Sequence, residues 1–559
     1  MKRILLYFLA GLFLFSLFCC EEEEKNPVPV ISGLSPASKV VNMPTFELFV
    51  TGSNFVGGSN IVFNNVEKET TFISSTELSC MIEPFEINPA AVMQGEHGAG
   101  ANHNAEDYQV EVFVRAPAPG GGDSSSLPFT VKNNHTFSTP SQVTNNEKGL
   151  NAKIAIDDEN NINMVYGHAT SSWKENATVY FRRSTDSGET WTNPKQVNSN
   201  NHSYSCPCEI KVLSGGKLLV VYDYLDTNSF KRYYFQTVSA DNGKTWSNPT
   251  AFFPTSIQSS CITCHIINEN KAYYAYTLYD GKPTPALGYE MKFIKRINNT
   301  WGPEQTISSG YFSHCTSINI DDEGNIYLYY GQADKDQIHS ICCTRSGDGG
   351  QTWSSPEEIT GITGKYNYVM GPYVCELSNN IILFWEEVTF TSSAGISVKP
   401  EFTGGINKAG MKKSLALYGD LEHKAKALTG EEKFYFRLSD GYGEPWGAKT
   451  EVNLGVDYRY DIWHPYIYND SADNLNLFVY KIVNTPGTHT FDLYRTYYSR
   501  STDLGQSWTK PVRLCNGSAG AYQARCAVLP GGDLYVLWSQ HQNPNDRCGW
   551  EIMFSKTTE

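Results

Sequence analysis

The sequence predicts an all-β fold built from a repeated unit of about four strands. Two observations predict it. The pattern Ser-x-Asp-x-Gly-x-Thr/Ser-Trp occurs four times, at residues 184–191, 239–246, 346–353 and 501–508. An alternating apolar stretch precedes each copy, and a proline with a short apolar segment follows it. Each copy therefore marks a hairpin between two antiparallel strands.

Each position of the pattern has a mechanical role. In the first copy, Asp186 can bond the backbone two residues on, and Gly188 supplies a backbone angle that a side chain would forbid. The ring of Trp191 is expected to pack on the neighbouring sheet. The copies are thus expected to fasten the fold rather than to catalyse a reaction. They resemble the Asp-box, or BNR repeat, of the sialidase-like β-propellers.

The number of units follows from the strands that open them. Openings fall near Ala152, Cys206, Cys261, Cys315, Gly371, Ile462 and Tyr522. This spacing predicts seven propeller blades, with six as the alternative, since sialidase catalytic domains of this resemblance have six. Units three and five carry degenerate boxes, at residues 297–303 and 438–446. Residues 136–143 look like a strand that follows a box and should pair with the C-terminal strands, closing the ring.

The first 20 residues read as a targeting signal. Lys2 and Arg3 precede an apolar run at residues 4–18, which is too short to span a bilayer. The segment resembles a bacterial lipoprotein signal with Cys20 lipidated; Cys19 and an ordinary cleaved secretion signal are the alternatives. The acidic tether at residues 21–26 resembles a surface-export signal. We therefore expect a lipid-anchored monomer at the outer membrane, exposed on the cell surface.

Residues 27–132 form a separate predicted domain. Alternating apolar segments such as residues 48–55 and 108–114 are separated by turns rich in Gly and Asn. Short strands of this kind predict a β-sandwich. The segment resembles the IPT/TIG immunoglobulin-like domain. The fold class expected for the whole chain is an Asp-box β-propeller, at residues 133–559, preceded by an Ig-like β-sandwich.

Charge and cysteine content exclude several classes of function. The net charge of −15 argues against a protein that binds nucleic-acid phosphates. The motif Cys261-x-x-Cys264-His265 matches a c-type haem attachment site, but it falls where an inner strand is expected. A metal site is the other alternative, built from Cys206, Cys208, Cys264, His265 and His314. We expect buried thiols or disulfides between inner strands instead, with no cofactor and no metal.

A binding site is expected over the central channel, at the face where the inner strands begin. The candidate ligand-binding residues there are His265, His314, Trp463, His464 and Gln523. The sialidase resemblance implies a catalytic set with arginines that clamp a carboxylate, a tyrosine nucleophile and acidic partners. The candidates for these roles are Arg459, Arg525, Tyr460, Glu386 and Asp223.

Two functional classes follow from this incomplete set. The family's Phe/Tyr-Arg-Ile-Pro signature should open the first blade, but residues 151–155 carry Lys153 in place of the arginine. A lysine cannot reproduce a bidentate guanidinium contact. The favoured prediction is therefore a non-catalytic module that binds a surface glycan or glycoprotein. The alternative is an exo-glycosidase of the sialidase type, so whether the chain is an enzyme stays open.

Overall fold

The computed structural model describes residues 25–41, 43–87, 107–145, 147–168, 178–202, 205–226, 231–253, 262–279, 289–310, 312–333, 339–361, 367–390, 430–441, 445–454, 465–482, 494–515, 520–541 and 550–558. Within these ranges the regular elements are strands and two short 3₁₀ turns, η1 (Pro84–Ile87) and η3 (Ser214–Gly216). The chain divides into two compact units between Asn133 and Asn134. In the described part, no helix has the length and apolar character needed to cross a membrane.

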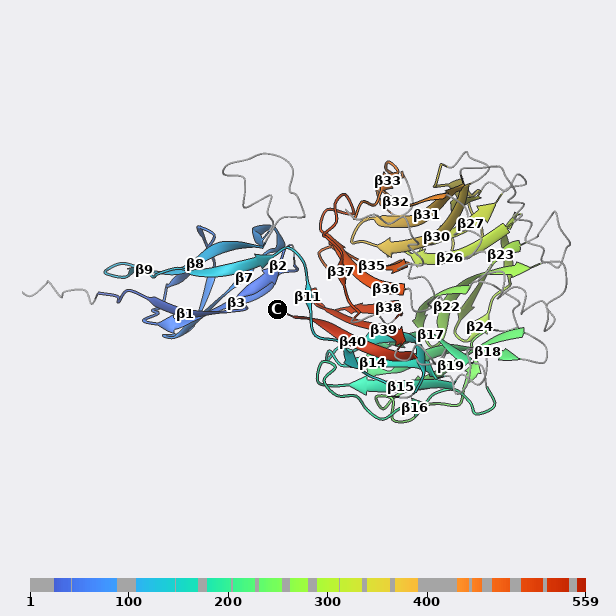
Figure 1. Cartoon of the computed structure of the whole chain (residues 1–559), viewed down its shortest axis with the longest axis horizontal. Coiled ribbons are helices and arrows are strands. Elements are labelled where there is room, and N and C mark those ends of the chain that lie inside the picture. Colours follow the sequence, from blue (N-terminus) through green and yellow to red (C-terminus); the bar gives the residue numbers. More distant parts are fainter. Residues whose placement is uncertain are drawn as a thin grey trace, which may run out of the picture. The chain divides into compact units, whose positions relative to one another are not determined.

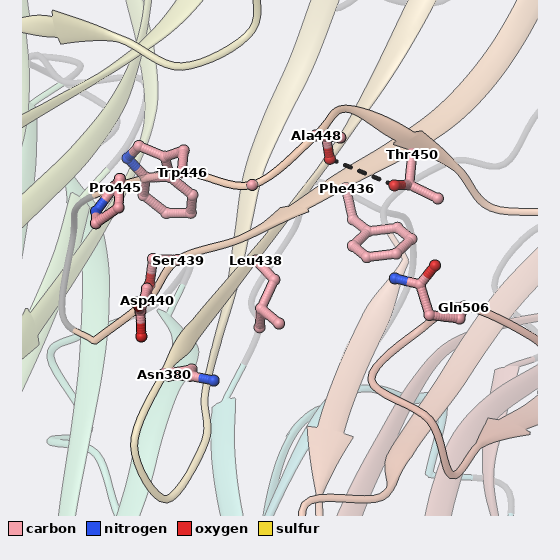
Figure 2. Close-up of a pocket in the computed structure, with 11 residues that line it drawn as sticks. Asn380, Phe436, Leu438, Ser439, Asp440, Pro445, Trp446, Ala448, Thr450 and Gln506 are labelled. Atoms are coloured by element: carbon pink, nitrogen blue, oxygen red, sulfur yellow. Dashed lines mark hydrogen bonds between the residues drawn. The ribbon is translucent and has the colours of Figure 1, made fainter.

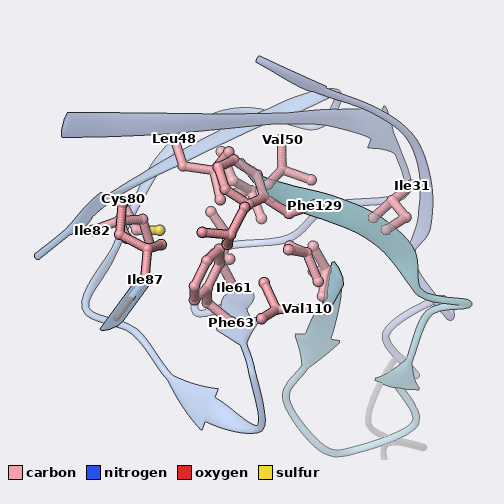
Figure 3. Close-up of a cluster of buried hydrophobic side chains, with 14 of the residues drawn as sticks. Ile31, Leu48, Val50, Ile61, Phe63, Cys80, Ile82, Ile87, Val110 and Phe129 are labelled. Carbon is pink, nitrogen blue, oxygen red and sulfur yellow. The ribbon is translucent and has the colours of Figure 1, made fainter. Parts of the chain in front are cut away.

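The N-terminal unit is a sandwich of two sheets. One sheet has the order β1 (Val30–Ser35), β3 (Phe46–Ser53), β7 (Glu77–Ile82) and β6 (Thr70–Ser74). The other has the order β2 (Ser38–Val40), β10 (Leu127–Lys132), β8 (Tyr108–Ala116), β4 (Asn60–Phe63) and β5 (Val66–Glu67), with β9 (Gly122–Asp123) beside β8. Alternate residues such as Leu48, Val50 and Phe129 face inward and form its core (Figure 3).

The second unit contains seven sheets that follow one another around a common axis (Figure 1). Blades one to three are β13 (Gly149–Ile156), β14 (Ile162–His168), β15 (Thr178–Ser184), β16 (Lys195–Gln196); β17 (Ser205–Val212), β18 (Leu218–Asp226), β19 (Lys231–Ser239), β20 (Thr250–Ala251); and β21 (Ile262–Asn268), β22 (Lys271–Tyr279), β23 (Tyr289–Ile297), β24 (Thr300–Trp301), β25 (Gln305–Gly310). Blades four to six are β26 (Phe312–Ile320), β27 (Ile326–Ala333), β28 (His339–Ser346), β29 (Glu357–Glu358); β30 (Asn367–Glu376), β31 (Ile381–Phe390), β32 (Gly430–Leu438), β33 (Thr450–Glu451); and β34 (Tyr466–Asn469), β35 (Leu475–Ile482), β36 (Tyr494–Ser501), β37 (Val512–Arg513).

The seventh blade is assembled from both ends of this unit. Its inner strands are β38 (Ala521–Val528), β39 (Leu534–His541) and β40 (Trp550–Thr558), and its outer strands are β11 (Thr136–Phe137) and β12 (Ser141–Gln142). Both outer strands pair antiparallel with β40, with Thr136 opposite Thr558 and Ser141 opposite Phe554. The predicted closure of the ring by residues 136–143 is confirmed, and the pairing leaves β40 without an open edge.

The packing between blades shows that the ring has seven members. The described residues of this unit form seven apolar clusters, and each joins one blade to the next, including blade seven to blade one. Within each second strand, neighbouring residues face opposite blades: Val165 of β14 packs on blade two, whereas Met164 packs on blade seven. The six-bladed alternative is therefore wrong.

The boxes form the outer corners of the blades. In the first box, the Ser184 hydroxyl donates to Asp186 (2.8 Å) and the backbone N–H of Thr190 donates to the same carboxylate (2.9 Å). The aspartate thus bonds the backbone four residues on, not two as expected, because the turn is longer than an Asx turn. The Trp191 ring packs edge-on against Phe554 of the preceding blade, with centroids 5.7 Å apart. The box therefore fastens one blade to its neighbour.

Candidate functional site

Strand register places seven polar residues at one level around the propeller axis. In each blade we consider the inner-strand residue opposite the fourth residue of the second strand, or opposite the fifth in β22, which begins one residue earlier. These residues are Lys153, Glu209, Thr263, Ser317, Tyr373, Tyr466 and Arg525, in the order of blades one to seven. We call them the polar layer. All seven side chains are half-buried.

The next level toward the box corners is different. The residues that follow the polar layer along the inner strands are Ile154, Ile210, Cys264, Ile318, Val374, Ile467 and Cys526. These side chains are apolar or thiols, and they face the preceding blade. These residues therefore pack between blades, one step along the inner strands from the polar layer.

Bulges in the inner strands determine which residues belong to the polar layer. The pairing of inner and second strands shifts just before Lys153, Glu209 and Arg525. Two of these bulges contain a non-glycine residue in the left-handed region, Asn151 (φ 54°) and Gln523 (φ 58°). A bulge inserts an extra residue and re-aims the side chain that follows it. The bulges thereby bring Lys153 and Arg525 into the same register as the polar-layer residues of the other blades.

Three consecutive blades bring charges together in the polar layer. The guanidinium of Arg525 lies 3.7 Å from the ring centroid of Tyr466 on the neighbouring blade, a cation–π contact. Burial and the nearby Arg525 charge lower the pKa of Lys153 to about 8, and Glu209 partly opposes this shift. Burial raises the pKa of Glu209, while Lys153 lowers it. Two cations and one carboxylate give this part of the layer a net positive charge when all three groups are ionised.

Two predicted carboxylates lie at equivalent positions of their second strands, further from the box corners than the polar layer. Asp223 and Glu386 are each the sixth residue of their second strand, β18 and β31, and both are buried. Glu386 accepts a hydrogen bond from the hydroxyl of Tyr373, at 3.3 Å, and so connects to the polar layer. Asp223 accepts from the backbone N–H of Cys206 (2.9 Å) and pairs with Arg232. Burial raises the pKa of Asp223, whereas Arg232 lowers it.

The other predicted site residues are distributed over several places. Gln523 lies in the bulge before Arg525, and its buried Oε1 accepts no hydrogen bond from the described residues. His265 lies two residues beyond the polar-layer residue of blade three, and burial lowers its pKa. The backbone of His314 belongs to β26. Arg459, Tyr460, Trp463, His464 and Cys20 lie outside the described residues.

Sequence reasoning missed four members of the polar layer: Thr263, Ser317, Tyr373 and Tyr466. They could have been found from their constant register against the second strand of each blade, which is rich in aromatic residues. The bulges obscure this offset, because a shift of one residue exchanges the two faces of a strand. Alternation counted along the inner strand alone therefore selects the wrong residues.

The cysteines whose side chains the structure describes are free thiols. They are Cys80, Cys206, Cys208, Cys264, Cys342, Cys343, Cys375, Cys515 and Cys526. Cys264 and His265 of the haem-like motif are consecutive residues of β21, while Cys261 lies outside the described residues. Among the described side chains, no group of three His, Cys, Asp or Glu is arranged to hold a metal ion. For the described cysteines, thiols rather than disulfides are found.

Comparisons with known proteins address the two units separately. Residues 29–144 match the family model of the IPT/TIG domain, so the chain contains such a domain. The match runs past Asn133 into β11 and β12, which pair in the propeller. No family model of the BNR repeat matches. A search of curated proteins finds no match.

Solved structures with a similar fold include several β-propeller glycosidases. An α-L-arabinofuranosidase from Fusarium graminearum is 13% identical, with 76% of this chain and 98% of that chain covered and a TM-score of 0.40. The Hadza microbial sialidase is 12% identical, with coverages of 87% and 77% and a TM-score of 0.38. A protein of unknown function from Dyadobacter fermentans is 13% identical, with coverages of 76% and 98% and a TM-score of 0.39.

Proposed function

We propose that the polar layer binds a surface glycan without cleaving it, and that an anionic group of the glycan lies against Lys153 and Arg525. The observation that carries this proposal is the pair of cations on adjacent blades, one of which stacks on Tyr466. Burial and the Arg525 charge lower the pKa of Lys153, so an anion that binds beside Lys153 stabilises its charged form. The two cations therefore favour a carboxylate or sulfate over a neutral group.

The remaining members of the layer suit the rest of a sugar. Thr263 and Ser317 offer hydroxyl groups that can donate and accept hydrogen bonds, and Tyr373 and Tyr466 offer aromatic surface with a polar edge. Sites for small ligands combine apolar walls with a few polar groups in fixed positions. A sugar ring, with its apolar face and hydroxyl rim, matches this combination.

Binding without cleavage is favoured because one lysine stands where a second arginine would be needed. Arg525 can grip a carboxylate through two parallel N–H bonds, whereas Lys153 presents a single point charge. A bidentate clamp from several arginines fixes the geometry of a reacting sugar far more tightly than one fork and one ammonium. The layer is thus better suited to hold a ligand than to strain it.

A glycan array probed with the full chain tests the proposal. We expect binding to glycans that carry a carboxylate or sulfate, and a loss of at least about tenfold in affinity for Arg525→Met and Lys153→Met. Lys217→Met is the matched control, because Lys217 pairs with Glu269 at an exposed corner away from the layer. Binding that is confined to neutral glycans, or unchanged in both layer variants, would refute it.

Hydrolysis is the second candidate, and one contact favours it. The Tyr373 hydroxyl donates to buried Glu386, and a carboxylate that takes the proton of a phenol can activate it as a nucleophile. If the protein is a sialidase-type exo-glycosidase, a fluorogenic sialoside is turned over by the wild type, and Tyr373→Phe removes that activity while retaining array binding. Absence of turnover with intact array binding favours the binding module.

We also propose that the chain acts as a monomer anchored to the outer membrane through a lipid on Cys20. The support is the basic, apolar and cysteine-bearing start of the sequence, followed by the acidic residues 21–24. Metabolic labelling with a fatty-acid probe should mark the wild type and not Cys20→Ala, with Cys19→Ala as the matched control. Labelling that depends on Cys19 alone would contradict the assignment, and protease treatment of intact cells tests surface exposure.

A further inference from the structure

A groove of about 510 Å³ lies beside the outer strands of blade five, whereas the polar layer belongs to the inner strands. It extends from strands β32 and β33 to the box of blade six. Leu438, Trp446 and Phe436 supply apolar surface, and Asn380, Asp440 and Gln506 supply polar groups. Figure 2 shows Leu438 between Asp440 and Gln506. We call this the blade-five groove.

The groove lies at a corner whose box has degenerated. When residues 439–446 are aligned with the intact boxes, Gly441 takes the place of the aspartate and Pro445 the place of the threonine. The bonds that tighten the other corners, such as those from Thr245 to Asp241 (2.6 and 2.9 Å), therefore cannot form here. Trp446 still packs against Tyr329 of blade four, at 6.1 Å. Trp446 therefore still joins blade five to blade four, although the aspartate and the threonine of the box are replaced.

Polar groups in the groove are presented to solvent above an apolar floor. The side chains of Asp440 and Gln506 are exposed, whereas Phe436 is buried beneath them. The side-chain oxygen of Asn380 accepts a hydrogen bond from the backbone N–H of Gly441 at 3.2 Å. Asp440 is the charged residue of the described lining, and neither Lys nor Arg contributes to it. The groove thus disfavours anions, in contrast to the polar layer.

We propose that the blade-five groove is a second binding site, for a short neutral oligosaccharide. Carboxylate and amide groups recognise sugar hydroxyls because together they accept and donate hydrogen bonds. The half-buried Trp446 and Leu438 provide surface for the apolar face of a sugar ring. The volume falls within the roughly 300–1,000 Å³ of small-molecule sites. This site is independent of the function proposed for the polar layer.

A peptide is a poorer occupant of the groove. Extended peptides commonly bind by adding a strand to the edge of a sheet. The edge strand here, β33, spans two residues, Thr450–Glu451, and offers too short a ladder of backbone groups for that mode. Recognition must come from side chains instead, and those present pair with hydroxyl groups.

The test is saturation-transfer NMR of the full chain with four neutral trisaccharides, built from glucose, mannose, xylose or N-acetylglucosamine. We expect saturable binding of at least one of them, weakened about tenfold by Gln506→Ala and by Asp440→Ala, since each variant loses hydrogen bonds to the ligand. Gln351→Ala is the matched control, because Gln351 holds the same box position in blade four and lies outside the groove lining. Arg525→Met should leave this binding unchanged.

Four results would overturn the proposal. The first is the absence of saturable transfer with all four trisaccharides. The second is binding that survives the Gln506→Ala and Asp440→Ala changes. The third is competition by an extended, uncharged peptide that depends on the same two residues, which would assign the groove to a protein partner. Loss of trisaccharide binding on changing Arg525 would place these sugars in the polar layer instead.

Discussion

The outer corners and the inner edge of the propeller use repetition in opposite ways. At the corners, the serine of each of four boxes donates to its aspartate at 2.7–2.8 Å, and each tryptophan packs on a phenylalanine of the preceding blade. At the inner edge, the seven equivalent positions of the polar layer carry six residue types. Equivalent positions that repeat thus maintain the ring, whereas equivalent positions that vary supply a site with several chemistries.

The two regions also differ in how they treat charge. The box aspartates are exposed (Asp186 and Asp348) or half-buried (Asp241 and Asp503), and hydrogen bonds to the carboxylate lower the pKa of Asp241 to about 2. Burial and, to a smaller extent, the charge of Arg525 disfavour the charged form of Lys153 in the polar layer and so lower its pKa. The charges of the box aspartates therefore stabilise the folded propeller, whereas the charge of Lys153 at the inner edge destabilises it. The following predictions test that contrast.

The largest effect is expected from adding a methyl group to a box glycine. Gly243 has φ +81°, and a Cβ at this position would lie 2.0 Å from Phe181 of the preceding blade. Gly243→Ala should therefore destabilise the propeller by about 3–5 kcal/mol, through backbone strain together with overpacking. Urea unfolding followed by tryptophan fluorescence isolates the effect, because all 11 tryptophans lie in the second unit.

Gly531→Ala provides the control for this change. The nearest atom to a Cβ at Gly531 is an oxygen of Asp533 at 4.0 Å, so the added methyl group meets open space. The control should shift the unfolding free energy by less than about 0.5 kcal/mol. Equal effects at the two glycines would mean that the boxes do not fasten the ring.

The second prediction concerns acid stability. The folded pKa values of Asp186 and Asp241 are lowered to about 2, chiefly by hydrogen bonds from Thr190 and Thr245. Their stabilisation is fully present above the unfolded value near 4 and is lost as the pH falls toward about 2. The double variant Asp186→Asn/Asp241→Asn should be less stable at pH 6 and should lose less stability between pH 4 and 2. Thermal unfolding by fluorescence across this pH range measures both slopes.

Asp440→Asn is the comparison for the acid experiment. Asp440 is next to the degenerate box of blade five but does not occupy the aspartate position of the pattern. Its replacement should leave the slope of the acid transition as in the wild type. A double box variant with the wild-type slope would show that other carboxylates control acid unfolding.

The sequence predicted the box corners and the number of blades, but it did not predict the polar layer. The boxes are local, so Asp186, Gly188 and Trp191 reveal a corner without knowledge of the rest of the chain. The closing strand at residues 136–143 was recognisable because it resembles the strands after the boxes. The positions of Lys153 and Arg525 in the polar layer instead depend on bulges. A bulge arises from the pairing of two strands, so the sequence of the inner strand alone does not reveal it. Four proposed site residues at 459–464 lie outside the described part of the chain, so their predicted roles stay predictions.

The third prediction is that Lys153→Met stabilises the propeller. The pKa of Lys153 is lowered to about 8 from its usual value near 10.4. The unfolded chain holds this proton more tightly, so the destabilisation is fully present below about pH 8 and disappears as the pH rises through 10.4. After allowance for solvent screening of a half-buried group, we expect a gain of about 1 kcal/mol at pH 7 and a smaller one at pH 9.5. Urea unfolding of Lys153→Met and Lys217→Met at both pH values tests this, and a loss of stability in Lys153→Met would contradict it.

The smallest effect is expected from Arg525→Lys, which keeps the charge and removes the planar group. The guanidinium lies 3.7 Å from the Tyr466 ring centroid, and a lysine ammonium would interact with that ring as a more strongly hydrated point charge. We expect a loss of about 0.5–1 kcal/mol in stability and a larger relative loss in binding of anionic glycans. Tyr466→Phe retains the ring and should preserve the contact, whereas Tyr466→Leu should remove it. If the Arg525→Lys and Tyr466→Leu effects add fully in the double variant, the two side chains are not coupled, and the inner edge owes its positive site to Lys153 and Arg525 without help from the aromatic ring.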